Sequence, residues 1–205
     1  MLFRSVFAVR VKSVMERRLS DSFRTTIKQQ YDFSCGSAAL ATLLTHHYRN
    51  PVDEQSAFRL MFESGDQEKI QRDGFSLLDM KRFLGSIGYQ ADGFEVTIDE
   101  LRDAKVPAIA LIRENGYNHF VVVKGIDGNT MLLGDPSVGT RTITRKAFEE
   151  MWSAKLFFVI RSHQEHAKFN DGSHWAFRLK APTTDGILSD TTAMAVLMRP
   201  GRNEF

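Results

Sequence analysis

The chain has 205 residues, of which 42% are hydrophobic and 25% charged, a composition typical of a globular protein with room for one ordinary domain. Its formal net charge of +2 is too small to indicate a polyanion partner, and no run of Lys and Arg interleaved with aromatic residues occurs. No apolar stretch approaches the roughly 20 residues that a membrane-spanning helix needs. Composition therefore argues against nucleic-acid binding and against a membrane span.

The N-terminal residues alternate between apolar and charged side chains. Over residues 9–14 this alternation has period two and predicts a strand at the edge of a sheet, and Glu16-Arg17-Arg18 is interpreted as a solvated strand face. Residues 1–11 contain neither an adequate h-region nor a small-residue cleavage site, so they do not predict a signal peptide.

The first ninety residues are predicted to be mostly helical. Apolar residues recur at helical spacing in three segments that begin at a cap or turn residue and end at Gly or before Pro. Their limits are Cys35 and Asn50, Pro51 and Gly65, and Ser76 and Gly88. Residues 66–74, between the second and third helices, form a polar stretch without an assigned structure.

Strands dominate from residue 93 onward. A short strand over residues 93–96 precedes a helix over 97–104, whose Thr97 and Glu100 form a capping box. Three apolar segments separated by turn residues then predict an antiparallel meander. These segments are residues 107–112, 119–126 and 130–134. A short helix over 145–152 and a strand over 155–161 follow.

The pattern weakens after residue 162, where the apolar residues lose their periodicity and Pro182, Gly186 and Pro200 interrupt the chain. We therefore predict one domain over residues 1–162 and an appendage over 163–205. The fold class is predicted to be α+β, with an N-terminal helical half packed on a C-terminal antiparallel sheet.

Cys35 is the only cysteine of the chain, so it cannot form an intrachain disulfide. A lone cysteine is either a small buried hydrophobe or a nucleophile. Its place at a helix N-terminus favours a nucleophile, because unpaired backbone N–H groups and the helix dipole stabilise a thiolate there and can donate to an oxyanion. Gly36 is expected to let the backbone approach a substrate.

A cysteine nucleophile needs a base, and position separates the six histidines. His46 and His47 follow Cys35 by about three helical turns, more than roughly 15 Å at about 1.5 Å per residue. His163, His166 and His174 lie in the predicted appendage, which we interpret as a solvated tail. His119 opens the most hydrophobic strand, where a polar side chain lies at a sheet end, and is therefore the predicted base.

Asp135 ends the strand paired with the one that His119 begins. If Ile126 pairs with Thr130, then His119 lies opposite Ser137 and Asp135 is its diagonal neighbour on the same face. A two-residue loop would place His119 and Asp135 on opposite faces, so their pairing predicts an odd-numbered loop or a bulge.

These residues meet the requirements of a cysteine peptidase: a thiolate, an imidazole that accepts and returns the proton, and a carboxylate that fixes the imidazole tautomer. An oxyanion donor is the remaining requirement. Gln29 and Gln30 precede Cys35 by six and five residues, and an amide from this loop could act together with the backbone N–H of Cys35.

Three motifs resemble one known family. They are QQYDFSCGSAALATLL at residues 29–44, GYNHFVVV at 116–123 and GDPSVG at 134–139. They resemble the papain-like cysteine peptidases that remove double-glycine leader peptides from exported bacteriocins, over about residues 9–161.

The resemblance implies a role for each matched position. Cys35 would be the nucleophile, His119 the base, Asp135 the residue that orients the imidazole, and Gln29 the oxyanion donor, with Gln30 as an alternative. Ser34 departs from the acidic residue usual in the transporter-fused members, so details of substrate preference are not transferred.

The chain shows no Walker motif or membrane helix, and so is similar to the free-standing members found beside bacterial export and functional-amyloid systems. This similarity implies a periplasmic location, with a cytoplasmic one left open. It also implies a polypeptide substrate, such as a secreted or amyloid-forming protein, and export machinery as a partner. No cofactor, metal, nucleic acid or membrane span is predicted.

Two other functions remain open. A peptide-binding module or secretion chaperone would keep the fold but have an unreactive thiol. Acyl-transfer or amidase chemistry would use the same three groups with another acceptor or substrate. A metal enzyme is disfavoured, because the histidines after residue 162 have neither an acidic motif at i, i+4 spacing nor a cysteine nearby.

Overall fold

The computed structural model describes residues 16–178. The strand predicted over residues 9–14 and the breaks at Pro182, Gly186 and Pro200 lie outside these residues. Residues 16–22 are helical, so the interpretation of Glu16-Arg17-Arg18 as a strand face was wrong. Three consecutive charged residues do not distinguish a strand from one exposed turn of helix.

The helical half follows the predicted order. Helix α2 (Cys35–Thr42) continues as a π-helical turn, Leu43–His47. The predicted second and third helices are confirmed as α3 (Glu54–Ser64) and α5 (Leu77–Ser86), the latter with a capping box at Ser76. The polar stretch between them contains a further helix that was not predicted, α4 (Gln67–Asp73).

Six strands form one antiparallel sheet in the order β1-β6-β2-β3-β4-β5. The strands are β1 (Ala91–Phe94), β2 (Ala108–Glu114), β3 (Tyr117–Asp127), β4 (Thr130–Asp135), β5 (Gly139–Thr144) and β6 (Trp152–Ile160). The meander β2-β3-β4 is confirmed, as are the helices α6 (Ile98–Ala104) and α7 (Arg145–Met151). Strand β5 was not predicted.

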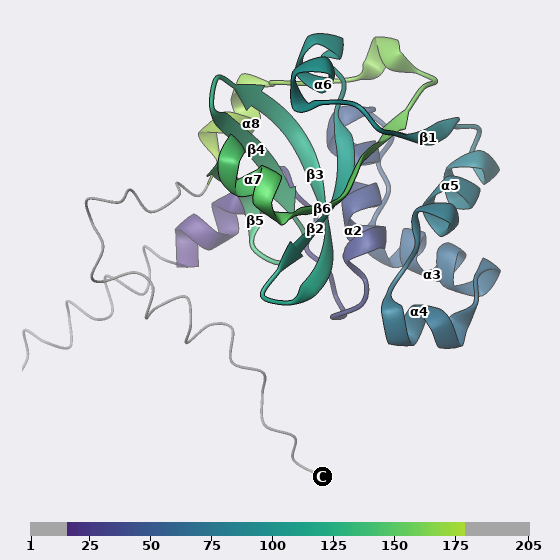
Figure 1. Ribbon diagram of the computed structural model, residues 1–205. Helices are drawn as coiled ribbons and strands as arrows, with labels where there is room; N and C mark the ends of the chain where they lie inside the picture. The colour runs from purple at the N-terminus through teal and green to yellow at the C-terminus, as the bar shows by residue number, and fades with distance from the viewer. Residues whose placement is uncertain (1–15, 179–205) are drawn as a thin grey trace, which may run out of the picture.

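Both faces of the sheet are covered (Figure 1). Helices α2, α3 and α5 pack on one face over a core that includes Val122 and Phe158. Helices α6 and α7 cover the other face, where Val121 and Val123 point. Alternate residues of β3 therefore belong to different cores, as the period of two along a strand requires. This layered α+β arrangement confirms the predicted fold class.

The hairpin between β3 and β4 contains a bulge, one of the two alternatives that the sequence predicted. Asp127 pairs with Thr130, so the loop has only two residues, and a three-residue loop is excluded. The register then shifts between Val123 and Gly125, leaving Lys124 as the extra residue. Beyond the bulge Val122 pairs with Gly134, the register that places His119 and Asp135 on one face.

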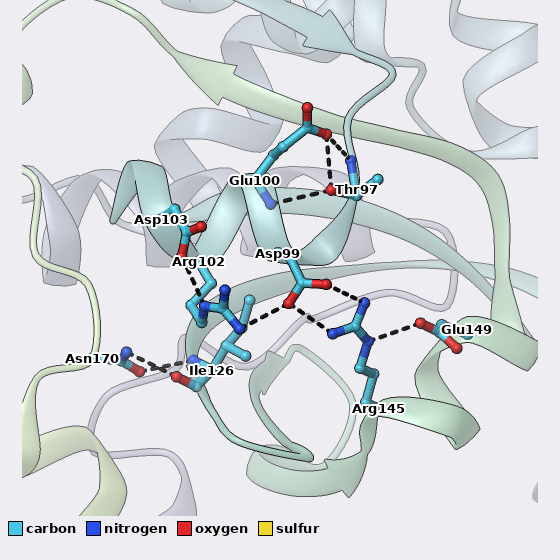
Figure 2. A network of polar contacts seen from close by, with 9 residues as sticks. All are labelled: Thr97, Asp99, Glu100, Arg102, Asp103, Ile126, Arg145, Glu149 and Asn170. Carbon is cyan, nitrogen blue, oxygen red and sulfur yellow. Dashed lines mark hydrogen bonds and ion pairs between the residues drawn. The ribbon is translucent and has the colours of Figure 1, made fainter.

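A segment after residue 162 returns to the domain. Asn170 accepts a hydrogen bond from the backbone N of Ile126 (2.8 Å) and donates one to its carbonyl (2.9 Å), a pair visible in Figure 2. His174, on α8 (Gly172–Ala176), is only 4% exposed, so its interpretation as part of a solvated tail was wrong. Weak periodicity hid this segment, which is fixed by hydrogen bonds more than by an apolar face. The domain limit at residue 162 stays a prediction.

Helices α6 and α7 are joined by ion pairs at the surface (Figure 2). The carboxylate of Asp99 accepts two hydrogen bonds from Arg145, at 2.8 and 2.9 Å, and one from Arg102 at 2.8 Å. Arg145 also donates to Glu149 on its own helix. These side chains are largely solvated, so each pair contributes little to stability. None of the helices in the described part of the chain is long and apolar enough to cross a membrane.

Candidate active site

Cys35 is the first residue of α2 and is 8% exposed. Its helix is buried over its whole length, which fixes the position of the thiol at the edge of the core. Gly36 also has a packing role. A Cβ at this position would lie 2.9 Å from both Met80 Cε and Phe75 Cβ, so glycine is needed for packing of α2 against its neighbours. The expected approach of a substrate stays a prediction.

His119 lies near the start of β3, and its imidazole contacts both of the other predicted groups. Its Nε2 is 2.7 Å from Oδ1 of Asp135, and its ring also hydrogen-bonds the side chain of Cys35. Burial lowers the pKa of His119, but the hydrogen bonds and charges of Asp135 and Cys35 outweigh burial and raise it to about 10. Because Nε2 faces the carboxylate, Nδ1 is the nitrogen left for the thiol proton.

Asp135 ends β4 and is only 2% exposed. Oδ1 accepts hydrogen bonds from His119 and from the backbone N of Ser137 (2.9 Å), and Oδ2 is 2.8 Å from Nη2 of Arg141. Burial alone would raise the pKa of Asp135, but the bonds from His119 and the charge of Arg141 lower it below its usual value. The carboxylate is therefore ionised and held at both oxygens.

Gln29 is connected to this group through the turn after β4. Its backbone N donates to the carbonyl of Pro136 (3.1 Å), and its Oε1 accepts from Oγ of Ser137 (3.1 Å), which lies 3.4 Å from Nε2 of His119. The side-chain Nε2 of Gln29 donates to the carbonyls of Tyr31 (3.0 Å) and, more weakly, Asp32 (3.4 Å) in the loop that leads to Cys35.

Gln30 points elsewhere. It lines a cavity of about 420 Å³ together with residues of the following loop and of α3, among them Tyr31, Glu54 and Phe58. Of the two glutamines that the sequence left open, Gln29 is the one whose contacts join it to the neighbours of His119 and Asp135.

Arg141, Glu114 and Ser137 belong to the same cluster and were missed from the sequence. Arg141 lies on β5 and donates from both Nη atoms to Glu114 at the end of β2, at 3.2 and 2.7 Å. The signal that could have found Arg141 is the alternation of residues 139–144 directly after the Asp135-Pro136 turn, which is typical of one more hairpin strand.

Lys124 is a buried lysine that connects two segments next to the site. Its side chain is fully buried, and Nζ donates to the carbonyl of Thr25 and lies 2.8 Å from Thr25 Oγ1 and 3.2 Å from Thr140 Oγ1. Burial lowers the pKa of Lys124 to about 7. The lysine thereby ties the segment that leads to Gln29 to the strand next to Asp135.

A thiol at the start of a buried helix, facing an imidazole that a buried carboxylate holds from an antiparallel sheet, defines a papain-like cysteine peptidase. The sequence profile of the Peptidase C39 family matches residues 24–164, most of the described chain. The chain belongs to this family.

Two curated relatives share the name probable functional amyloid protease FapD. The protein of Pseudomonas aeruginosa is 40% identical over 150 residues, which cover 73% of this chain and 65% of that protein. The protein of Pseudomonas fluorescens is 38% identical over 156 residues, 76% of this chain and 67% of that protein. The chain thus matches about two thirds of the length of these relatives.

A transporter also carries a related segment. The lactococcin-G-processing and transport ATP-binding protein LagD of Lactococcus lactis is 31% identical over 135 residues, 64% of this chain and 18% of that protein. The small share of LagD shows that the similarity is confined to one part of the transporter.

Solved structures agree on the fold. The peptidase domain of Streptococcus ComA superposes with a TM-score of 0.56 at 20% identity, covering 66% of this chain and 96% of that domain. A double-glycine-motif protease from an AMS/PCAT transporter, solved with a leader peptide, gives a TM-score of 0.54 at 24% identity, covering 66% and 89%. At these identities the likeness establishes the fold alone.

Proposed function

We propose that the protein hydrolyses a peptide bond of an exported polypeptide, directly after a Gly-Gly leader. In this proposal Cys35 is the nucleophile and His119 is the general base and acid. Asp135 orients the imidazole, and Gln29 donates to the oxyanion. The observation that carries the proposal is the position of His119, which contacts a buried carboxylate at one nitrogen and the lone thiol with its ring.

The chemistry follows from this geometry. The thiol proton passes to Nδ1 of His119 as Sγ of Cys35 attacks the carbonyl carbon, and the carbonyl π electrons move to oxygen. Gln29 and the backbone at the start of α2 stabilise this oxyanion. The intermediate collapses with cleavage of the C–N bond, the amine leaves with the proton from His119, and a thioester remains on Cys35.

Deacylation uses the same groups in reverse roles. His119 removes a proton from water, the resulting hydroxide attacks the thioester carbonyl, and the carbon–sulfur bond breaks. The acid product leaves, and the thiolate of Cys35 is restored beside the imidazolium. Throughout, the bond from Nε2 of His119 to Asp135 keeps the ring in the tautomer that presents Nδ1 to the sulfur.

The relatives support the choice of substrate class. The FapD proteins are named as functional amyloid proteases, LagD as a processing and transport protein, and the AMS/PCAT protease was solved with its leader peptide. An amyloid-forming polypeptide fits the name of the FapD proteins, and an exported polypeptide with a leader fits the other two names. We further propose the periplasm as the compartment where the protein acts, which fractionation of the native host would test.

The direct test is cleavage of a synthetic peptide that carries a Gly-Gly leader, with products identified by mass spectrometry. Wild type should cut after the second Gly, and Cys35→Ala and His119→Ala should each abolish cleavage. His166→Ala, at an exposed position, is the control and should leave the rate unchanged. Cleavage surviving Cys35→Ala would disprove the mechanism, and tight binding without cleavage by wild type would favour a peptide-binding module.

A further inference from the structure

A series of ion pairs extends from the proposed triad across neighbouring strands, at one end of the sheet. Glu114 ends β2, His119 is near the start of β3, Asp135 ends β4, and Arg141 lies on β5. These strands are antiparallel neighbours, so these residues lie at the same end of the sheet. Arg141 spans them: Nη2 is 2.8 Å from Oδ2 of Asp135 and 2.7 Å from Oε2 of Glu114.

Burial of the side chains differs along this series of ion pairs. The side chain of Asp135 is 2% exposed, that of Arg141 17%, and that of Glu114 38%. The guanidinium is thus shielded from water next to the carboxylate that faces His119, whereas the glutamate lies at the solvent boundary. Charges interact more strongly where water is excluded, so Arg141 has more influence on the triad than an exposed arginine would.

The second oxygen of Asp135 has no role in the reaction itself. Oδ1 accepts from His119, while Oδ2 is held by Arg141, so rotation of the carboxylate would break an ion pair in a buried setting. The planar fork of arginine can hold Glu114 and Asp135 at once, which the single ammonium of lysine does less well. Glu114 in turn fixes the guanidinium and compensates its charge.

We propose that Arg141, held by Glu114, is a positioning residue that fixes the carboxylate of Asp135 and sets the pH range in which the Cys35–His119 pair is reactive. This inference rests on the proposed function. It assigns Arg141 and Glu114 opposite electrostatic effects on the imidazole, although both belong to one structural unit.

The signs follow from charge counting. Glu114, Arg141 and Asp135 together have a net charge of −1 beside His119. Removing the positive charge makes the surroundings more negative, so the imidazolium persists to higher pH and the thiolate forms at higher pH. Removing the negative charge of Glu114 has the reverse effect. The titratable groups in contact with His119 are Cys35 from α2 and Asp135 from β4. Arg141 from β5 and Glu114 from β2 are joined to it through Asp135.

The test uses the fact that Cys35 is the only cysteine of the full chain. The rate of alkylation by iodoacetamide is measured from pH 4 to 11 and gives the pH midpoints of Cys35 reactivity without a peptide substrate. Nuclear magnetic resonance of the His119 ring gives the titration of the imidazole independently. The variants are Arg141→Met, Arg141→Lys and Glu114→Gln, and Arg145→Met from the surface network of Figure 2 is the matched control.

Arg141→Met should move the midpoints to higher pH by about 0.5 to 1 unit, and Glu114→Gln should move them to lower pH by a smaller amount because Glu114 is more exposed. Arg141→Lys keeps the charge and should restore the wild-type midpoints, with a slower rate. Arg145→Met should change neither quantity.

Midpoints that stay in place, or that move in the same direction in Arg141→Met and Glu114→Gln, would overturn the inference in favour of a purely structural ion pair. If Arg141→Met does not fold, Glu114→Gln and Arg141→Lys decide the matter by themselves. Failure of the proposed function is distinguishable, since wild type and His119→Ala would then be alkylated at the same rate.

Discussion

Nε2 of His119 lies 2.7 Å from Oδ1 of Asp135. This contact is possible because β3 and β4 are shifted by one residue relative to the register of a regular two-residue hairpin. Lys124 is the extra residue of β3, and a regular two-residue hairpin without it would place the imidazole and the carboxylate on opposite faces of the sheet. The bulge is therefore part of the architecture of the proposed site, and the following measurements test this site and its surroundings.

Asp135→Asn should lower kcat for the leader-bearing peptide by about 10²–10⁴-fold. The amide has no negative charge to stabilise the imidazolium and can present N–H to His119, which favours the wrong tautomer. Asp99→Asn, which removes a carboxylate from the surface network of Figure 2, is the control and should keep the wild-type kcat. An Asp135→Asn enzyme with wild-type kcat would show that the carboxylate does not orient the base.

Gln29→Ala should reduce kcat by about 10²–10³-fold with a small change in KM, because an oxyanion donor acts mainly in the transition state. Gln30→Ala provides the comparison, since its side chain lines the separate cavity beside Phe58. The ratio of the two kcat values answers the question that the doubled glutamine leaves open. A larger loss in Gln30→Ala would transfer the role to that residue.

Gly134→Ala should destabilise the fold by about 1–3 kcal/mol, as for other overpacked cores. The added Cβ would lie 3.0 Å from Cδ of Lys124 and 3.0 Å from Oγ1 of Thr26, so it would push the buried lysine away from its hydroxyl partners. Urea denaturation measures the effect. Gly85→Ala on α5, where a Cβ meets no atom within 4 Å, should be neutral or stabilising, and equal effects at both positions would contradict this account.

Lys124→Met should change how stability depends on pH. The folded lysine loses its proton near pH 7 and the unfolded lysine near 10.5, so between these values the unfolded chain binds more protons and the free energy of unfolding rises with pH. The variant should lack this contribution, which is at most about 1.4 kcal/mol per pH unit. Denaturation at pH 7 to 10 tests it against exposed Lys146→Met, and parallel stability curves for Lys124→Met and wild type would contradict it.

The sequence predicted the parts of the fold that have a strong apolar period. Helices α3 and α5 and the strands of the meander repeat apolar residues often enough to specify their structure. Helix α4 does not, because Ile70 is its only buried residue, and only its caps at Asp66 and Gly74 marked it. Strand β5 alternates threonine with Gly139, Arg141 and Ile143, which is a weaker signal than the apolar runs of the meander, so it was not predicted.

The candidate site, like the fold, could be predicted only in part from the sequence. Cys35, His119 and Asp135 could be proposed together from the sequence because each has a suitable chemical type and lies at or near a strand or helix end, and the structure places them close to one another. Arg141 and Glu114 have no such mark, since only the tertiary register brings the ends of β2 and β5 together. The close packing of Gly36 against Phe75 and Met80 was not predicted, because no sequence period reveals it.

The most direct test of the central claim, that His119 activates Cys35, is the rate of iodoacetamide alkylation at pH 6 in wild type and in His119→Ala. The account predicts rapid alkylation of wild type and a rate lower by about tenfold or more in the variant, because the imidazolium no longer stabilises the thiolate. Equal rates in the two proteins, with the same folded state by circular dichroism, would contradict it.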